Sequence, residues 1–564
     1  MELIDQHTKR IMEGCKERAR SAGLRFEDET LEYIVTNRDL LELSPKAMIP
    51  TLYDYWVHDV EVLKEKGKYE LYPGNPYETV INTRPAISFY NDNNPDWLNV
   101  MIFYHVLGHI DFFQNNLFYR HTWDYDFCAS ALADKRFIAR MRAEKGRWVD
   151  YVIEFARGID NLVGYHRALS SLHRSREPVY SRRLDFYFDV FLQREKKLKT
   201  GAYMKEIEAF NENIKTYGPK KGEKHFFTEV AKRYPEFEAH FSKHREEQTG
   251  LRFDVIAYLL ENAEFLNREE NRWMKAILQV VRNTSMFLQP QIRTKIMNEG
   301  WASYWHERLF LEDDRIHGHE VDYARVNAGV TAMPRVGLNP YALGMRLFQH
   351  IESVADHGRL SIAYQRLLDA EERSRFDQKT RDGQAFIFSV RENLSDFLFI
   401  NTFLDQDFIN NHRLFVAGRR ANRQKMAWEY YVKSRKVEDY RRMVIDTLYH
   451  PPFVEIDESR QQDGSLYLFH HFEGKPLIRD FIPNTLMGIE FLWNGPVKLE
   501  TSEPLASGQT EERAATGVFT IADIEAKKKK KYRWQRVLYT MKNRKLSRSV
   551  IGSTGGETAA EAVA

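Results

Sequence analysis

The chain has 564 residues, 43% of them apolar and 13% aromatic, which is enough for a large core and two or more domains. Acidic and basic side chains nearly cancel, to a net charge of +2, so no overall field favours nucleic acid or a membrane surface as partner. Cys15 and Cys128 are the two cysteines, which argues against a disulfide framework and a cysteine metal cluster and favours a reducing compartment.

The first residues contain no apolar signal region, and no run of apolar residues is long enough to predict a membrane span. We therefore expect a cytoplasmic protein. Apolar spacing predicts that residues 1–440 form a mainly helical domain. Its expected helices lie at 2–22, 27–43, 97–119, 252–286, 341–357, 360–374, 384–400 and 420–434, with short extended segments at 79–82 and 86–90. We expect Pro290 to end the helix that precedes it.

Residues 182–245 are rich in interleaved acidic and basic side chains. We interpret them as a charged, solvated excursion from the helical body and not as a nucleic-acid patch.

The pattern changes near residue 441. Strands are predicted at 442–449, 465–472 and 496–501, and a helix at 477–493. This β-α-β order predicts a small α+β domain over 441–545. The lysine run Lys527–Lys531 is interpreted as a solvated linker, and residues 546–564 as a disordered tail.

A predicted buried helix contains two histidines four residues apart, His105 and His109. Residues at this spacing share one helix face, so both imidazoles can hold one metal ion. Zinc peptidases use such a pair as H-E-x-x-H, but Val106 stands here in place of their general base. The alternative is a pair of buried histidines satisfied by hydrogen bonds. A second pair, His240 and His244, has charged neighbours and is interpreted as a solvated helix face.

The second informative stretch is residues 297–307, where Glu299, Ser303 and His306 would form one stripe of a helix. A buried carboxylate is costly unless it is paired or bound to a cation. Asn-Glu-x-x-Ala is also how gluzincin-type peptidases present a third zinc ligand. The alternative is that Glu299 caps or salt-bridges a neighbouring helix. Two histidines and one glutamate predict a site for zinc or another divalent metal.

Hydrolysis at such a site needs a base to replace the missing glutamate. His306 and Glu307 are the candidate bases, and Tyr304 is the candidate donor to an oxyanion. Residues that could support or orient ligands are Asn298, Asn115, Asn116 and Asp111. Of these, Asp111 lies two residues past His109 and is expected to face away from the metal.

The segments HVLGHIDFFQNN, at 105–116, and MNEGWASYWH, at 297–306, resemble signature blocks of the SpoVR family, the stage V sporulation protein R family. Further matching segments lie at 84–94, 290–297, 339–344 and 492–501, so the resemblance covers most of the chain. It implies a link to spore cortex formation in spore formers and to stress response elsewhere. It also implies two partners, a serine protein kinase of the AAA+ type and a von Willebrand A-like protein. This chain departs from the family at Asn327, where family members tend to carry a histidine.

Two function classes follow. The first is a divergent metal-dependent amidase or peptidase-like hydrolase that acts on a peptide or cell-wall precursor. The second is a non-catalytic interaction or regulatory protein whose metal is structural or absent. Val106 favours the second class, and the two histidines and Glu299 in an aromatic setting favour the first. The expected fold is mainly α, with gluzincin-like metal-site helices in a large helical domain and a small C-terminal α+β domain.

Overall fold

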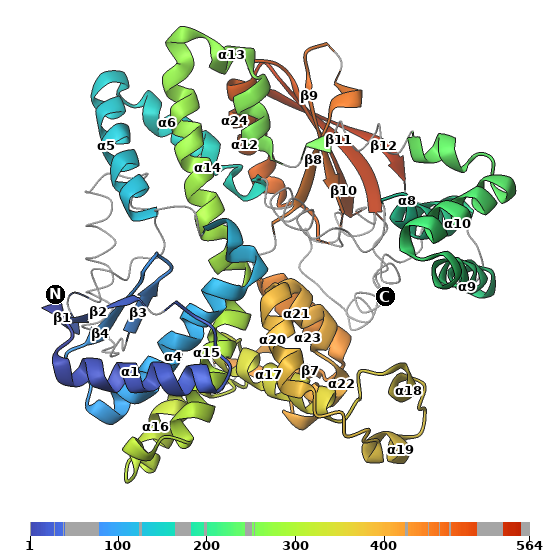
Figure 1. The fold of residues 1–564 in the computed structure, drawn as a ribbon. Helices are drawn as coiled ribbons and strands as arrows, with labels where there is room; N and C mark the ends of the chain where they lie inside the picture. The colour runs from blue at the N-terminus through green and yellow to red at the C-terminus, as the bar shows by residue number, and fades with distance from the viewer. Residues whose placement is uncertain are drawn as a thin grey trace. The chain divides into compact units, whose positions relative to one another are not determined.

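The computed structural model describes residues 2–27, 29–37, 39, 78–122, 127–163, 182–196, 200–242, 251–252, 254–422, 427–448, 451–461, 463–472, 475–504 and 534–553. The chain forms two compact units, each assembled from two stretches of sequence (Figure 1). Unit 1 is Met1–Ile153 with Ala276–Pro451, and unit 2 is Glu154–Lys275 with Pro452–Ala564. Unit 2 thus joins the C-terminal sheet to residues 154–275, a combination that the linear pattern does not predict.

Unit 1 begins with a mixed sheet in the order β1-β2-β4-β3. The elements here are β1 (Glu2–Leu3), α1 (Gln6–Ser21), β2 (Thr30–Val35), β3 (Glu78–Ile81) and β4 (Ala86–Asn91). β2 runs parallel to β4, and the ring of Tyr33 stacks on Phe89 at 5.6 Å. The helix predicted over 27–43 was wrong at β2, because the aromatic and β-branched run of residues 33–35 suits a pleated strand.

The helical body of unit 1 follows the sheet. Its helices are α4 (Asp96–Asn115), η1 (Leu117–Thr122), α5 (Phe127–Lys145), α6 (Trp148–Arg157), α14 (Arg272–Arg293), α15 (Lys295–Leu311), η5 (Asp314–Ile316), α16 (Glu320–Thr331), α17 (Pro340–Asp356), α18 (Ile362–Gln365), α19 (Ala370–Arg375), α20 (Gly383–Asn393), α21 (Asp396–Phe403), α22 (Gln406–Asn411) and α23 (Val437–Thr447). Of these, α6 and α14 continue into unit 2. The mainly helical prediction is confirmed.

Helix α4 is buried on every face from Leu98 to Gln114, as expected of a helix that is apolar all round. It packs against α15 so closely that a Cβ on Gly108 would lie 2.7 Å from the Cα of Ala302. On its other side α15 meets α17, where a Cβ on Gly300 would lie 2.4 Å from the Cα of Gly344. Small residues therefore let three helix backbones approach closely and hold α15 at the centre of unit 1.

The first turn of α15 is held by a buried carboxylate from α21. Asp396 accepts hydrogen bonds from the backbone N–H groups of Ile296 and Met297, at 2.8 and 2.9 Å. These N–H groups have no partner within their own helix, so the carboxylate satisfies them and complements the helix dipole. Burial raises the pKa of Asp396 to about 7. The contact fixes where α15 begins, four residues before Glu299.

Unit 2 contains a six-stranded sheet in the order β12-β11-β10-β9-β8-β5. Its strands are β5 (Leu251–Arg252), β8 (Phe453–Asp457), β9 (Leu466–His471), β10 (Val497–Pro504), β11 (Trp534–Lys542) and β12 (Lys545–Ser553). β9 and β10 are parallel and are connected through α24 (Ile482–Trp493), which is the predicted β-α-β unit. The short helices η6 (Glu458–Arg460) and η7 (Arg479–Phe481) lie between strands.

The predicted charged excursion has an apolar core of its own. Its elements are α8 (Arg182–Asp185), the π-helix η3 (Phe186–Glu195), α9 (Thr200–Tyr217) and α10 (Pro219–Arg233), preceded by η2 (Asp160–Leu162) and followed by α12 (Val255–Asn262), α13 (Glu264–Asn267) and η4 (Glu269–Asn271). Tyr187, Phe191, Phe226 and Phe237 are buried together there. The charges lie around this core, so the segment is a folded piece and not only a solvated excursion.

Three further local predictions were wrong. The strands β6 (Val416–Asn422) and β7 (Ala427–Ser434) pair in antiparallel fashion, where a helix was expected over 420–434. Residues 442–447 lie in α23, where a strand was expected, and the buried Val437, Tyr440 and Val444 form a helical stripe. Pro290 does not end α14, which continues to Arg293.

The C-terminal part of the sheet extends further than expected. β12 pairs with β11 through a turn at Asn543 and Arg544, both with positive φ, as in the tight turns of hairpins. The predicted tail therefore overlaps a strand up to Ser553. The rest of that tail and the Lys527–Lys531 run lie outside the described residues. Within the described residues, no helix combines the length and the apolar character needed to cross a bilayer.

Candidate metal centre

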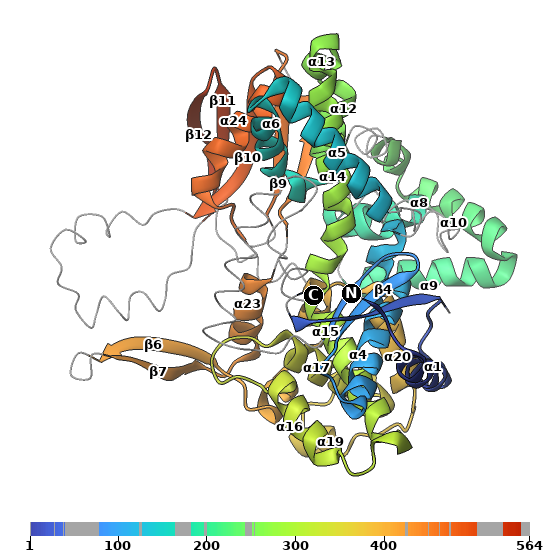
Figure 2. The same ribbon diagram turned by 90° about the vertical axis from the view of Figure 1, so that its left-hand side faces the viewer.

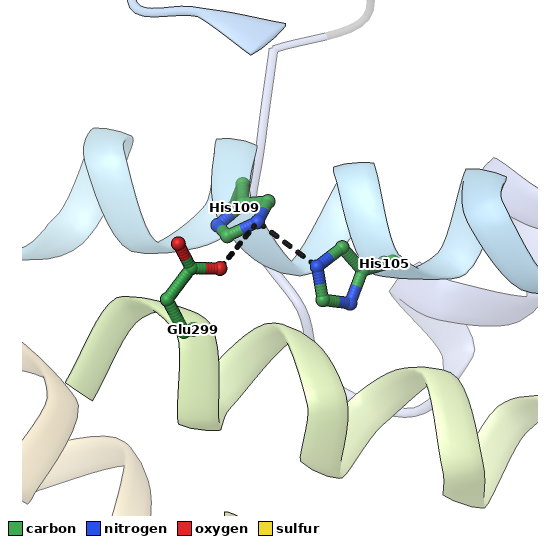
Figure 3. Close-up of side chains that lie close together, drawn as sticks. All are labelled: His105, His109 and Glu299. Carbon is green, nitrogen blue, oxygen red and sulfur yellow. Dashed lines mark hydrogen bonds and ion pairs between the residues drawn. The ribbon is translucent and has the colours of Figure 1, made fainter. Parts of the chain in front are cut away.

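Two packed helices bring the three predicted metal ligands together (Figure 3). His105 and His109 come from α4 and Glu299 from α15, and one ligand atom of each lies within 4.8 Å of the others. The imidazoles approach through their Nε2 atoms, which are 3.1 Å apart. His109 Nε2 lies 3.5 Å from Glu299 Oε2. The close approach at Gly108, between the two histidines, is what allows a side chain of α15 to reach both rings.

A chain of hydrogen bonds fixes which nitrogen of His105 is free. Asn327 donates from Nδ2 to Glu307 Oε2, which turns its Oδ1 toward His306 Nε2 at 3.0 Å. An amide oxygen only accepts, so His306 carries its proton on Nε2 and accepts through Nδ1. His105 Nδ1 lies 2.9 Å from that atom and donates to it. The lone pair of neutral His105 is therefore on Nε2, the atom that faces His109.

The tautomer of His109 is fixed in the same way, by Asn298 on α15. Its Nδ1 lies 2.9 Å from Asn298 Oδ1 and donates to it. The lone pair of His109 is then also on Nε2. Two lone pairs 3.1 Å apart repel each other unless a proton or a cation lies between them. Orienting partners of this kind are typical of metal-binding histidines.

The separations of the ligand atoms fit a small divalent ion. Zinc binds nitrogen and oxygen at about 2.0–2.2 Å, which places two ligands of a tetrahedral ion about 3.3 Å apart. Two of the three separations, 3.1 and 3.5 Å, bracket that value, and all three ligand atoms lie within 4.8 Å of one another. Glu299 Oε2 is buried and accepts no hydrogen bond from the described residues. The residues therefore fit a divalent metal better than they fit one another.

Burial keeps His105 and His306 neutral. The pKa of His105 is well below its ordinary value, because the ring is desolvated and lies beside His109 and His306. Burial also lowers the pKa of His306 to about 4. Aromatic rings enclose the site: Tyr341 stacks on His105 and Phe113 on His109, each at 6.0 Å. Neutral imidazoles at neutral pH are the form that binds metals.

The candidate catalytic residues do not lie on the metal side of the ligands. His306 contacts the far nitrogen of His105, and Glu307 accepts hydrogen bonds from Asn327 and Gln349. Both positions are those of residues that orient a ligand. Glu307 and Asn327 also line an open pocket of about 520 Å³. The hydrogen-bond chain therefore runs from this pocket to His105.

Tyr304 is committed to a separate network. Its hydroxyl donates to Glu352 Oε2 at 2.6 Å and accepts from Arg308 Nη1 at 2.6 Å. Burial and the carboxylate of Glu352 raise the pKa of Tyr304. Val106 is fully buried in the core around α4. The side chain at the position of the usual general base is thus apolar and inaccessible to solvent.

A family model described as "SpoVR like protein" matches residues 3–450 of the chain. The chain belongs to the SpoVR-like protein family. A separate comparison with curated proteins finds a relative, "Uncharacterized protein YcgB" of Escherichia coli (strain K12), 26% identical over 336 residues. The matched region covers 57% of this chain and 59% of the length of YcgB. No solved structure matches the chain.

The family match spans all three ligand positions and the residues that orient them. Asn327, noted as a departure from the SpoVR family pattern, lies within that set, where it holds His306. Sequence reasoning placed the ligands but gave Asn327 no role, since nothing local marks it. Tyr341, which stacks on His105, is the first residue of the helix predicted over 341–357, but nothing in the local sequence indicates that contact.

The other three residues predicted to support the metal, Asp111, Asn115 and Asn116, form hydrogen bonds with groups other than the three ligands. Asp111 binds the indole of Trp301 and the guanidinium of Arg391. Asn115 donates to the backbone carbonyls of Arg25 and Asp111, and Asn116 to those of Arg391 and Leu394. Of the four predicted supporting residues, Asn298 is the one in direct contact with a ligand.

Proposed function

We propose that this SpoVR-like protein is a divalent-metal protein that holds zinc through His105, His109 and Glu299 and hydrolyses amide bonds. The observation that carries the proposal is the pair of Nε2 lone pairs beside a buried carboxylate oxygen that accepts no hydrogen bond from the described residues. Three protein ligands leave further positions of the ion open, as in catalytic zinc sites. When bound, the ion supplies Lewis-acid chemistry, which polarises a carbonyl and activates water.

The chain's own residues bind and orient in this proposal. His306 and Asn298 hold the two imidazoles in the metal-binding tautomer, and the aromatic shell limits access of bulk water. Substrate would reach the site as an extended peptide or a cell-wall precursor, the class suggested by the family's link to the spore cortex.

The weak point of a hydrolase is proton transfer. Neither His306 nor Glu307 faces the ion's open side in this arrangement, and Val106 cannot accept a proton. The leaving group of the substrate would then have to accept the proton from the attacking water. Absence of a positioned base costs roughly 10²–10⁴-fold in rate, so we expect slow turnover. Replacing Val106 with glutamate would not restore the base, because a carboxylate there would be buried without a partner.

This missing base favours a second candidate function, a regulatory or interaction protein in which the metal is structural. The resemblance to the SpoVR family suggests a serine protein kinase and a von Willebrand A-like protein as its partners. A stress-response or sporulation role would then depend on binding and not on turnover.

One experiment separates the two functions. The purified chain is stripped with a chelator, reloaded with one equivalent of zinc, and assayed on amide, peptide and muropeptide substrates. A hydrolase should show zinc-dependent turnover that Glu299→Gln abolishes and Tyr304→Phe keeps, since the Tyr304 hydroxyl is engaged by Glu352. Full zinc occupancy without turnover on any substrate would contradict the hydrolase and support the second function.

A further inference from the structure

The hairpin of β6 and β7 exposes large apolar side chains that proteins normally bury. Figure 2 shows the two strands reaching out from the helices of unit 1 as a ribbon. Trp428 and Tyr430 are 60% and 59% exposed, and Tyr431 and Val432 are each 46% exposed. Four such residues within five positions form a concentrated patch, and patches of this kind mark interaction sites.

The strand register divides these side chains between two faces. Trp428, Tyr430 and Val432 alternate along β7, so they share one face. Arg419 pairs with Tyr430 across the hairpin and belongs to the same face. Its guanidinium carbon lies 5.1 Å from the centre of the Trp428 ring. We call Arg419, Trp428, Tyr430 and Val432 the aromatic face.

The ribbon is also strongly basic. Among the described residues between 416 and 436 there is one acid, Glu429, on the opposite face, where it pairs with Arg420 at 3.3 Å. The basic residues in the same span are Arg419, Arg420, Lys433, Arg435 and Lys436. The near-zero net charge of the whole chain hides this local excess. A partner of the ribbon should therefore be anionic.

We propose that the aromatic face binds single-stranded nucleic acid, with bases stacked on Trp428 and Tyr430 and phosphates held by Arg419 and the neighbouring basic residues. Rings two residues apart on a strand stand about 7 Å apart on one face. Sheets that bind single-stranded RNA use aromatic residues on strands in this way, and stacking tolerates any base sequence. The ribbon is separate from the metal centre, so this inference does not depend on the proposed function.

The composition of the face argues against two other anionic partners. A lipid bilayer would take the rings into its apolar region, but Arg419, which pairs with Tyr430 across the strands and lies over the Trp428 ring, would be carried in with them. An acidic peptide would pair with the basic residues but offers no flat rings to Trp428 and Tyr430. A single strand supplies phosphates and flat rings together.

The test measures binding of the full chain to fluorescently labelled 12-nucleotide RNA and DNA single strands by anisotropy. We expect micromolar affinity that falls with salt, with a slope of about −2 for about three contacted phosphates. Inorganic polyphosphate of equal charge, polyglutamate and vesicles with anionic lipid serve as comparison probes and should bind at least tenfold more weakly. Equal or tighter binding of any of these three probes would overturn the proposal.

Variants locate the site. Trp428→Ala with Tyr430→Ala should weaken binding tenfold or more, and Trp428→Phe with Tyr430→Phe should keep it, because the rings remain. Trp148→Ala with Tyr151→Ala is the matched control, since those rings are 53% and 50% exposed outside the ribbon. Unchanged binding of the first double variant, or equal loss in the control, would refute the assignment. Unaltered circular dichroism of each variant shows that a loss of binding is not a loss of folding.

Discussion

The interface between α4 and α15 contains two carboxylates, Asp111 and Glu299, that differ in burial and in their partners. Asp111 on α4 accepts hydrogen bonds from the Trp301 indole at 2.8 Å and the Arg25 backbone at 2.7 Å, and it pairs with Arg391 at 3.2 Å. Glu299 on α15 faces imidazole nitrogens whose lone pairs point toward it and toward each other.

The difference separates structure from function within one pair of helices. A buried carboxylate with an arginine and two N–H donors is complete without any ligand, so it holds the helices together. Glu299 lies beside two imidazoles instead of an arginine, and a divalent ion bound there would supply the positive charge. Residue type alone would not distinguish the two, since both are acids on the same interface, but Asp111 is fully buried and Glu299 is 18% exposed.

The largest expected effect is on Asp111, the carboxylate whose partners are all supplied by the protein. Asp111→Asn leaves Arg391, whose side chain is 3% exposed, without its counter-charge, and should lower the free energy of unfolding by about 3–5 kcal/mol. The matched variant Glu299→Gln, measured in chelator, should change it by less than about 0.5 kcal/mol. Urea denaturation of both variants checks this. Equal destabilisation would mean that Glu299 is also a structural residue.

The second prediction concerns how the free energy of unfolding depends on protonation of His306 at acidic pH. The unfolded chain takes up a proton at His306 near pH 6.5, but the folded protein does so only near pH 4. In the metal-free protein this stabilisation is therefore complete above pH 6.5 and is lost as the pH falls toward 4, by about 3 kcal/mol. Denaturation in chelator across this range should show a steeper loss for the wild type than for His306→Gln. Parallel pH profiles would contradict it.

The third prediction compares the two glutamates of α15. Glu299→Gln removes a ligand and should weaken zinc binding about 100-fold or more. Glu307→Gln disturbs only the hydrogen-bond chain through Asn327 and should weaken zinc binding about tenfold. Competition with a fluorescent zinc chelator measures both affinities. Similar small losses would assign Glu299 a structural role, and a larger loss at Glu307 would reverse the roles proposed for the two residues.

The smallest effect concerns the orientation of His109. Asn298→Ala removes the acceptor for His109 Nδ1 and should weaken zinc binding about tenfold, and Asn298→Asp, which keeps an acceptor, should restore it. Asn115→Ala serves as control, because Asn115 bonds backbone carbonyls away from the ligands. Loss of affinity in the control alone would show that distortion of α4, and not ring orientation, sets the affinity.

Much of the metal centre could be predicted from the sequence because its ligands follow helical spacing. His105 and His109 are four residues apart, which predicts that they share one helix face. Glu299 lies in an otherwise aromatic helix, which predicts that the helix is buried. The structure brings these three together. The roles of His306 and Glu307 were less readable, because spacing shows that residues share a stripe but not which side of a ring they contact.

The errors in the fold have local causes. Two segments have apolar spacing that fits a short helix as well as a strand, namely Tyr33 to Val35 and Trp428 to Val432. Both form strands, which their aromatic and β-branched residues favour. The division into units could not be read, because residues 154–275 join the C-terminal sheet through contacts distant in sequence. Asp111 was placed on the correct side of α4 by its spacing, but its partners Trp301 and Arg391 are contributed by other helices.

The most direct test of the metal centre is the zinc content of the full chain. The protein is stripped with chelator, incubated with excess zinc, desalted and analysed by inductively coupled plasma mass spectrometry. The account predicts one zinc per chain in the wild type and in the control His240→Ala with His244→Ala, and none in His105→Ala with His109→Ala. A wild type without zinc, or a His105 and His109 double variant that retains it, would contradict the account.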